Sequence, residues 1–132
     1  MAQPTGAEVK RVERPLSPHI QIYRIQVTSV SSILTRITGN AIIVAVVLAV
    51  WWLLAAAVSD RYFAAADWVV TGWFGDLVFT LSLLGVWYHY LAGLRHLYFD
   101  GGHGLDIKTA EWLGWACIIG APVLTVLTLI VI

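Results

Sequence analysis

Three long apolar runs, separated by short polar segments, dominate the hydrophobic pattern of this chain. They cover residues 41–58, 77–94 and 112–132. Each reaches the roughly 18 to 20 residues that a helix needs to cross the hydrocarbon core of a bilayer. The runs are continuously apolar and lack the two-residue alternation of membrane barrel strands. The pattern therefore predicts an all-α membrane protein with three transmembrane helices, at about residues 30–58, 74–99 and 110–132.

The composition supports a membrane protein, because 59% of the 132 residues are hydrophobic and only 12% are charged. Soluble domains carry about twice that share of charged residues. We expect a single transmembrane domain over residues 1–132, in which residues 1–29 form an N-terminal segment at the cytoplasmic membrane surface. Serine side chains are favourable N-caps, so three serines before the first apolar run are predicted to cap its helix. They are Ser29, Ser31 and Ser32.

Positive charge is concentrated before the first apolar run. Five of the eight Lys and Arg residues lie in or before the start of the first span: Lys10, Arg11, Arg14, Arg24 and Arg36. The positive-inside rule then places the N-terminus and the second loop in the cytoplasm, and the first loop and C-terminus on the opposite side. Eight acidic residues balance the eight basic ones. We expect the lipid bilayer as a partner and no nucleic acid.

His89 lies deep inside the second apolar run. An ionisable residue at that depth is costly unless it has a partner, which makes His89 a candidate functional residue. Gly93 and His96 follow at four and seven residues, on the same stripe of a helix. Gly93 leaves a gap beside His89 of the kind that a flat haem requires. Alternatively, Gly93 allows close helix packing and His89 bonds a neighbouring polar group.

If His89 ligates a haem iron, the second axial ligand must come from another chain. Seven residues of helix span about 10 Å, whereas two imidazole nitrogens on opposite sides of one iron are only about 4 Å apart. His96 cannot be that second ligand, but it could bond a haem propionate. Arg95 points about 120° away from the His89 stripe. We interpret it as an interface anchor that pairs with Asp100 or a lipid headgroup.

Two blocks, residues 14–39 and 89–104, together resemble the cytochrome b membrane-anchor subunit (C subunit) of succinate dehydrogenase, complex II. The motif residues are Arg14, Pro15, Ser32, Ile33, Leu34, Arg36 and Thr38 in the first block, and His89, Gly93, Arg95, His96 and Asp100 in the second. The resemblance covers the whole chain. It implies a multi-pass protein of a bacterial inner (plasma) membrane or a mitochondrial-type inner membrane.

The resemblance also implies partners and cofactors. In the family, a flavoprotein subunit oxidises succinate and an iron–sulfur subunit passes the electrons toward the membrane. The C subunit and a second membrane-anchor subunit hold haem b between them and form the site that reduces ubiquinone. This chain would then serve the tricarboxylic acid cycle and respiratory electron transport without any catalytic residue for succinate oxidation.

Residue roles follow from the same resemblance. His89 matches the axial ligand of the haem iron, and the second anchor subunit supplies the other ligand. Ser32 and Arg36 match the quinone-binding residues, with Ile33 as apolar wall. Arg36, His96 and Gly93 are candidates for contact with a haem propionate or for packing against the haem. Thr35 stands where the family usually has a histidine, so the propionate contacts are left open.

Three other functions are alternatives. The chain could be the anchor of a fumarate reductase, because reaction direction and quinone type are not fixed by these residues. It could be a haem-free structural anchor in which His89 makes a polar contact. A small transporter subunit would be expected to carry more polar residues along a pathway than one histidine stripe.

Overall fold

The structure, a computed structural model, describes residues 14–132. In order, the helices of this part are α1 (Val27–Val58), α2 (Asp60–Val70), α3 (Trp73–Asp100) and α4 (Ile107–Val131). Helices α1, α3 and α4 are long and apolar enough to cross a membrane, which confirms the all-α, three-span prediction. What was expected of residues 1–13, including the positive charges there, lies outside the described residues.

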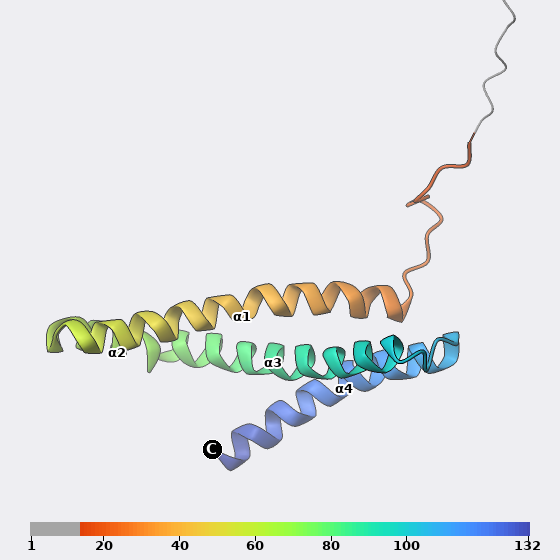
Figure 1. Cartoon of the computed structure of the whole chain (residues 1–132). Coiled ribbons are helices and arrows are strands. Elements are labelled where there is room, and N and C mark those ends of the chain that lie inside the picture. Colours follow the sequence, from red (N-terminus) through yellow and green to blue (C-terminus); the bar gives the residue numbers. More distant parts are fainter. Residues whose placement is uncertain (1–13) are drawn as a thin grey trace, which may run out of the picture.

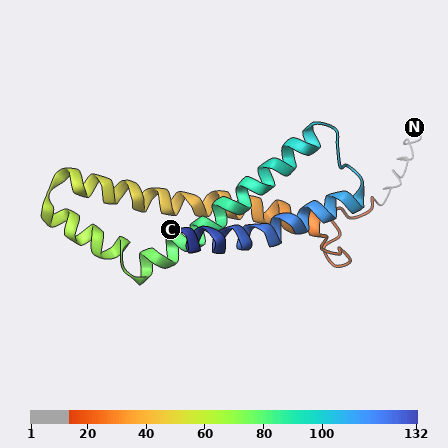
Figure 2. The same ribbon diagram turned by 90° about the horizontal axis from the view of Figure 1, so that it is seen from below.

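Helices α1 and α3 run antiparallel, and α4 lies at an angle to α3 (Figure 1). The start of α1 and the loop between α3 and α4 lie at the same end of the molecule, and α2 lies at the opposite end. The view from below shows α3 crossing both α1 and α4 (Figure 2). One end of the molecule therefore gathers the start of α1, the end of α3 and the start of α4.

The three long helices pack mainly through small residues. Tyr88 and Ala92 of α3 form a buried cluster with Cys117 and Ala121 of α4. In lipid, helices associate through close packing and interhelical hydrogen bonds, and small residues allow their backbones to approach. One such hydrogen bond runs from Trp87 Nε1 to Thr128 Oγ1, at 3.0 Å. Most large apolar side chains of α1 and α4 stay exposed, as suits helices that face lipid or other chains.

The N-cap prediction for α1 is wrong. The helix begins at Val27, and its N-cap, Gln26, makes no side-chain capping hydrogen bond. The three serines therefore lie within the first two turns of α1 rather than before it. Ser29 Oγ lies 2.7 Å from the hydroxyl of Tyr23, and Ser31 is completely buried against α3. The hydroxyls of Ser29 and Ser31 thus bind groups outside α1 instead of capping it.

The connection expected as a loop between the first two spans contains the helix α2. Ser59 is its N-cap and accepts a hydrogen bond from Tyr62 N at 3.4 Å. Asp67 of α2 accepts a hydrogen bond from Trp52 Nε1 of α1 at 3.0 Å, which ties α2 back to the first span. With 11 residues, α2 is too short to cross a membrane.

Candidate functional site

His89 projects from α3 against the backbone of α1. Its Nδ1 atom lies 3.1 Å from the carbonyl oxygen of Thr35. A carbonyl oxygen only accepts hydrogen bonds, so Nδ1 carries a proton in this contact, and in the neutral imidazole Nε2 then keeps its lone pair. The ring lies beside Gly39, where a Cβ atom would be only 3.1 Å from His89 Cε1. Of the two neutral tautomers, the contact with Thr35 selects the one in which Nε2 can bind a metal.

Open space lies next to His89 along α3. A Cβ atom added to Gly93 would meet nothing within 4 Å, apart from its own helix backbone. His96, one further turn along, is exposed, as is His89 itself. The His89, Gly93 and His96 stripe that the sequence predicts therefore faces outward from the described part of the chain. Its surroundings leave room for a group that this chain does not itself supply.

The quinone-site candidates lie on the adjacent face of α1. Ser32 is half-buried, whereas Arg36 and Ile33 are exposed. Offsets of four and seven residues place Ser32, Arg36 and Gly39 on one face of the helix. Because the imidazole of His89 lies beside Gly39, the structure brings His89 and the Ser32–Arg36 face into one region. Sequence analysis named both sets of residues but could not place them side by side.

A buried polar cluster that the sequence analysis missed joins α1 to α3. Its members are Ser31, Tyr88 and Arg95, which expose 0%, 5% and 7% of their surface. Arg95 Nη1 donates a hydrogen bond to Ser31 Oγ at 2.5 Å. The Tyr88 hydroxyl lies 3.0 Å from both the carbonyl oxygen and the Oγ of Ser31 and donates to them. Directional bonds to one serine therefore fix how α1 sits along α3.

The interpretation of Arg95 as an interface anchor is wrong. Its side chain does point away from the His89 stripe, but it turns into the interface between helices rather than toward Asp100 or a headgroup. Its guanidinium carbon lies 5.5 Å from the centre of the Phe99 ring, at a distance typical of a cation–π contact. A Cβ atom on Gly114 of α4 would lie 3.6 Å from Arg95 Nη1. Arg95 therefore packs between α1 and α4, close to the backbone of Gly114.

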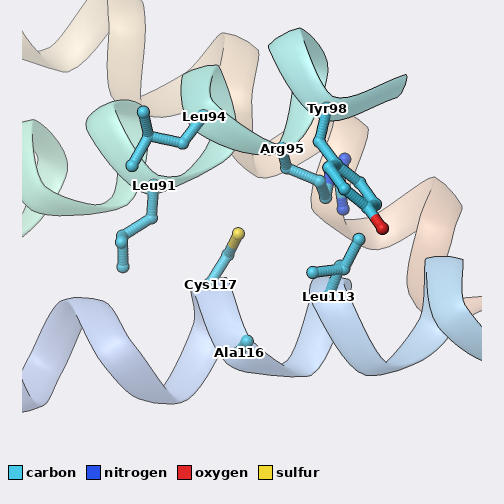
Figure 3. Close-up of a pocket in the computed structure, with 7 residues that line it drawn as sticks. All are labelled: Leu91, Leu94, Arg95, Tyr98, Leu113, Ala116 and Cys117. Atoms are coloured by element: carbon cyan, nitrogen blue, oxygen red, sulfur yellow. The ribbon is translucent and has the colours of Figure 1, made fainter. Parts of the chain in front are cut away.

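A separate apolar cavity lies between α3 and α4, on the side of α3 away from His89. Its volume is about 220 Å³. Figure 3 shows its lining residues: Leu91, Leu94, Arg95, Tyr98, Leu113, Ala116 and Cys117. The residues that α3 contributes point away from the His89 stripe by helical periodicity. This cavity is therefore not part of the region around His89.

The fold and this region define a transmembrane protein with three spanning helices. One of these helices carries a histidine, His89, that is exposed on the surface of the bundle. The chain belongs to the family described as succinate dehydrogenase/fumarate reductase transmembrane subunit, which it matches over residues 10–129. Membership confirms the resemblance that the two motif blocks indicated.

Individual relatives are similar over nearly the whole chain. The succinate dehydrogenase cytochrome b556 subunit of Paracoccus denitrificans is 53% identical over 125 residues, which cover 95% of this chain and 96% of the relative. The cytochrome b556 subunit of Rickettsia conorii is 36% identical over 116 residues, covering 87% and 90%. The succinate dehydrogenase cytochrome b560 subunit of Reclinomonas americana is 34% identical over 109 residues, covering 79% and 76%.

Proposed function

We propose that this chain is a membrane-anchor subunit of succinate dehydrogenase that binds haem b together with a second anchor subunit. The two anchors also form part of the site that reduces ubiquinone with electrons from the iron–sulfur subunit. Succinate oxidation belongs to the flavoprotein subunit and not to this chain. The relatives' names, as cytochrome b subunits of succinate dehydrogenase, support the assignment and favour it over a fumarate reductase anchor.

The contact between His89 and Thr35 carries the haem proposal. Metal-bound imidazoles almost always donate their second ring N–H to a carbonyl or carboxylate, which fixes the ring and raises its basicity. His89 makes this contact through Nδ1, so Nε2 would bind the iron. The open space at Gly93 fits a flat macrocycle beside the ligand. When bound, haem supplies a one-electron redox centre within the membrane.

Thr35 has no free hydroxyl for a haem propionate. Its Oγ1 donates to the carbonyl oxygen of Ser31 at 2.8 Å, and its own carbonyl holds His89. The backbone carbonyl of Thr35 therefore accepts the hydrogen bond from the His89 imidazole. The histidine side chain that the family usually has at this position is absent. Arg36 and His96, which are exposed and lie nearer the membrane interface, would then bind the haem propionates.

Ser32 and Arg36 are proposed to bind ubiquinone from α1. Ser32 would donate a hydrogen bond to a quinone carbonyl, and Arg36 would stabilise the negative charge that the quinone oxygens gain with each electron. Two electrons and two protons convert the quinone to the quinol, so proton delivery through bound water near Arg36 completes the reaction. Exposed Ile33 provides apolar surface for the quinone ring.

Purified membrane complex containing this chain tests the proposal. Dithionite should produce a reduced b-type absorption band, and succinate should drive ubiquinone reduction. Deletion of the chain should release the flavoprotein and iron–sulfur subunits from the membrane while they still reduce an artificial dye. Absence of the band from an intact assembly would mean a haem-free structural anchor.

A further inference from the structure

Arg95 places a positive charge in the core of the helix bundle. It exposes 7% of its surface, and its Nε atom is buried with no hydrogen-bond partner in the described part of the chain. The guanidinium donates instead to a neutral acceptor, Ser31 Oγ. A buried charge of this kind is costly to keep. Its place in the bundle needs an explanation other than anchoring at the membrane surface.

Three hydrogen bonds, joined by the covalent structure of Ser31 and Thr35, lead from Arg95 to His89. Arg95 Nη1 binds Ser31 Oγ, and the carbonyl oxygen of Ser31 accepts from Thr35 Oγ1 at 2.8 Å. The Thr35 carbonyl oxygen in turn lies 3.1 Å from His89 Nδ1. Both ends of this set belong to α3, and the middle is one turn of α1. The position of that turn therefore decides where the carbonyl that holds His89 lies.

Apolar contacts alone would fix this turn poorly. Leu34 packs against the buried cluster around Tyr88, but Ile33 and Ile37 are exposed, and membrane helices gain no hydrophobic driving force from packing together in lipid. The hydrogen bonds that Arg95 and Tyr88 make to Ser31 are directional and buried. Sliding α1 along α3 would break them and would displace the Thr35 carbonyl from His89.

We propose that Arg95 is a positioning residue for His89. Through Ser31 it holds the turn of α1 whose Thr35 carbonyl orients the imidazole, and its buried charge raises the affinity of the haem for an electron. This inference rests on the proposed haem function of His89. A nearby cation in a low-dielectric interior favours the reduced state of a redox centre, because reduction adds one negative charge.

The test uses the intact four-subunit complex and four variants of this chain. Arg95→Met removes the charge and the hydrogen bond, and Arg95→Lys keeps the charge. Ser31→Ala removes the acceptor and keeps the cation. Arg61→Met is the matched control, because Arg61 is exposed on α2 at the other end of the molecule. For each complex, haem content, the low-spin electron paramagnetic resonance spectrum and the haem midpoint potential are measured.

Arg95→Met and Ser31→Ala should both shift the resonance spectrum of the haem, because the imidazole loses its orientation. Arg95→Met should also lower the ratio of reduced to oxidised haem about tenfold at a fixed ambient potential, which is 59 mV for one electron. Arg95→Lys and Ser31→Ala should both retain most of the wild-type haem midpoint potential. Arg61→Met should change neither the resonance spectrum nor the midpoint potential.

Wild-type spectrum and potential in assembled Arg95→Met would overturn the inference and leave the haem proposal intact. If Arg95→Met fails to assemble, Ser31→Ala tests the positioning role instead. An unchanged resonance spectrum in Ser31→Ala overturns that role. Absence of haem from the wild-type complex would instead refute the proposed function itself.

Discussion

The carbonyl oxygen of Thr35 lies 3.1 Å from Nδ1 of His89 and joins the backbone of α1 to the imidazole of α3. Two transmembrane helices are therefore needed to present a single proposed haem ligand. Any change that moves α1 relative to α3 at this level should alter haem binding before it alters the fold.

Replacement of Gly39 should disturb His89 directly. A Cβ atom at Gly39 would lie 3.1 Å from His89 Cε1, so the ring must shift to admit it. We expect haem content per complex to fall from wild type to Gly39→Ala and further to Gly39→Val. Gly85→Ala is the matched control on α3, because its Cβ would make ordinary contacts of 3.6 Å and longer with α1. Equal haem loss in the Gly39 and Gly85 variants would argue against a specific contact with His89.

A bulky residue at position 93 should separate folding of the chain from haem binding. Nothing within 4 Å would meet a Cβ at Gly93, and replacing an interior helical glycine raises helix propensity by up to about 1 kcal/mol. Gly93→Leu should therefore keep its helical circular dichroism but lose haem, because leucine fills the space proposed for the macrocycle. Gly93→Ala should retain more haem. Full haem content in Gly93→Leu would place the macrocycle elsewhere.

Ser32→Ala and Arg36→Ala should impair quinone reduction selectively. Loss of a donor aimed at developing negative charge reduces rates by about 10²-fold or more in other enzymes. Succinate-dependent ubiquinone reduction should therefore fall while succinate oxidation by an artificial dye is nearly unchanged. Arg61→Ala, on the exposed side of α2, is the control. Equal loss of both activities in the Ser32 and Arg36 variants would indicate failed assembly instead.

Acid should weaken the start of α4 through Asp106. This residue is the N-cap, and its Oδ2 accepts a hydrogen bond from Thr109 N at 2.9 Å. That backbone hydrogen bond lowers the pKa of the Asp106 carboxyl from its ordinary value of 3.8. The lowered pKa means that Asp106 stabilises the fold above pH 3.8 and that this contribution is lost as pH falls through the folded-state pKa.

Asp106→Asn tests this contribution, because asparagine also caps helices but carries no titrating carboxyl. Thermal unfolding of the purified complex, followed by circular dichroism, should lose less stability on acidification in Asp106→Asn than in wild type. The same acid sensitivity in both proteins would show that Asp106 does not contribute to it.

The three spans, and the need of His89 for a polar partner, could be predicted from sequence because each depends on a strong, local energetic cost. Apolar runs long enough to cross lipid have few alternatives to helix, and an imidazole among them needs a partner. Helical periodicity also placed Arg95 away from His89. Periodicity could not show whether that face of α3 meets lipid or another helix, so the burial of Arg95 against Ser31 was missed.

Helix α2 was not predicted, for a different reason. Its 11 residues mix alanines with charged groups and are too few to cross a membrane, so no long apolar run marks it. A signal was present in Ser59 followed by Asp60, since a serine N-cap with an acidic residue in the first turn is typical of a helix start. The same type of signal was misleading at Ser29, Ser31 and Ser32, because α1 already begins at Val27 and the hydroxyls of Ser29 and Ser31 bind Tyr23, Tyr88 and Arg95.

The most direct measurement is the reduced-minus-oxidised absorption spectrum of the purified complex carrying His89→Leu. His103→Leu is the matched histidine control, because His103 lies exposed in the loop after α3, with its ring 5.4 Å from that of Tyr98. The proposed function predicts that the b-type band is lost in His89→Leu and kept in His103→Leu. A band of wild-type position and intensity in assembled His89→Leu would contradict it.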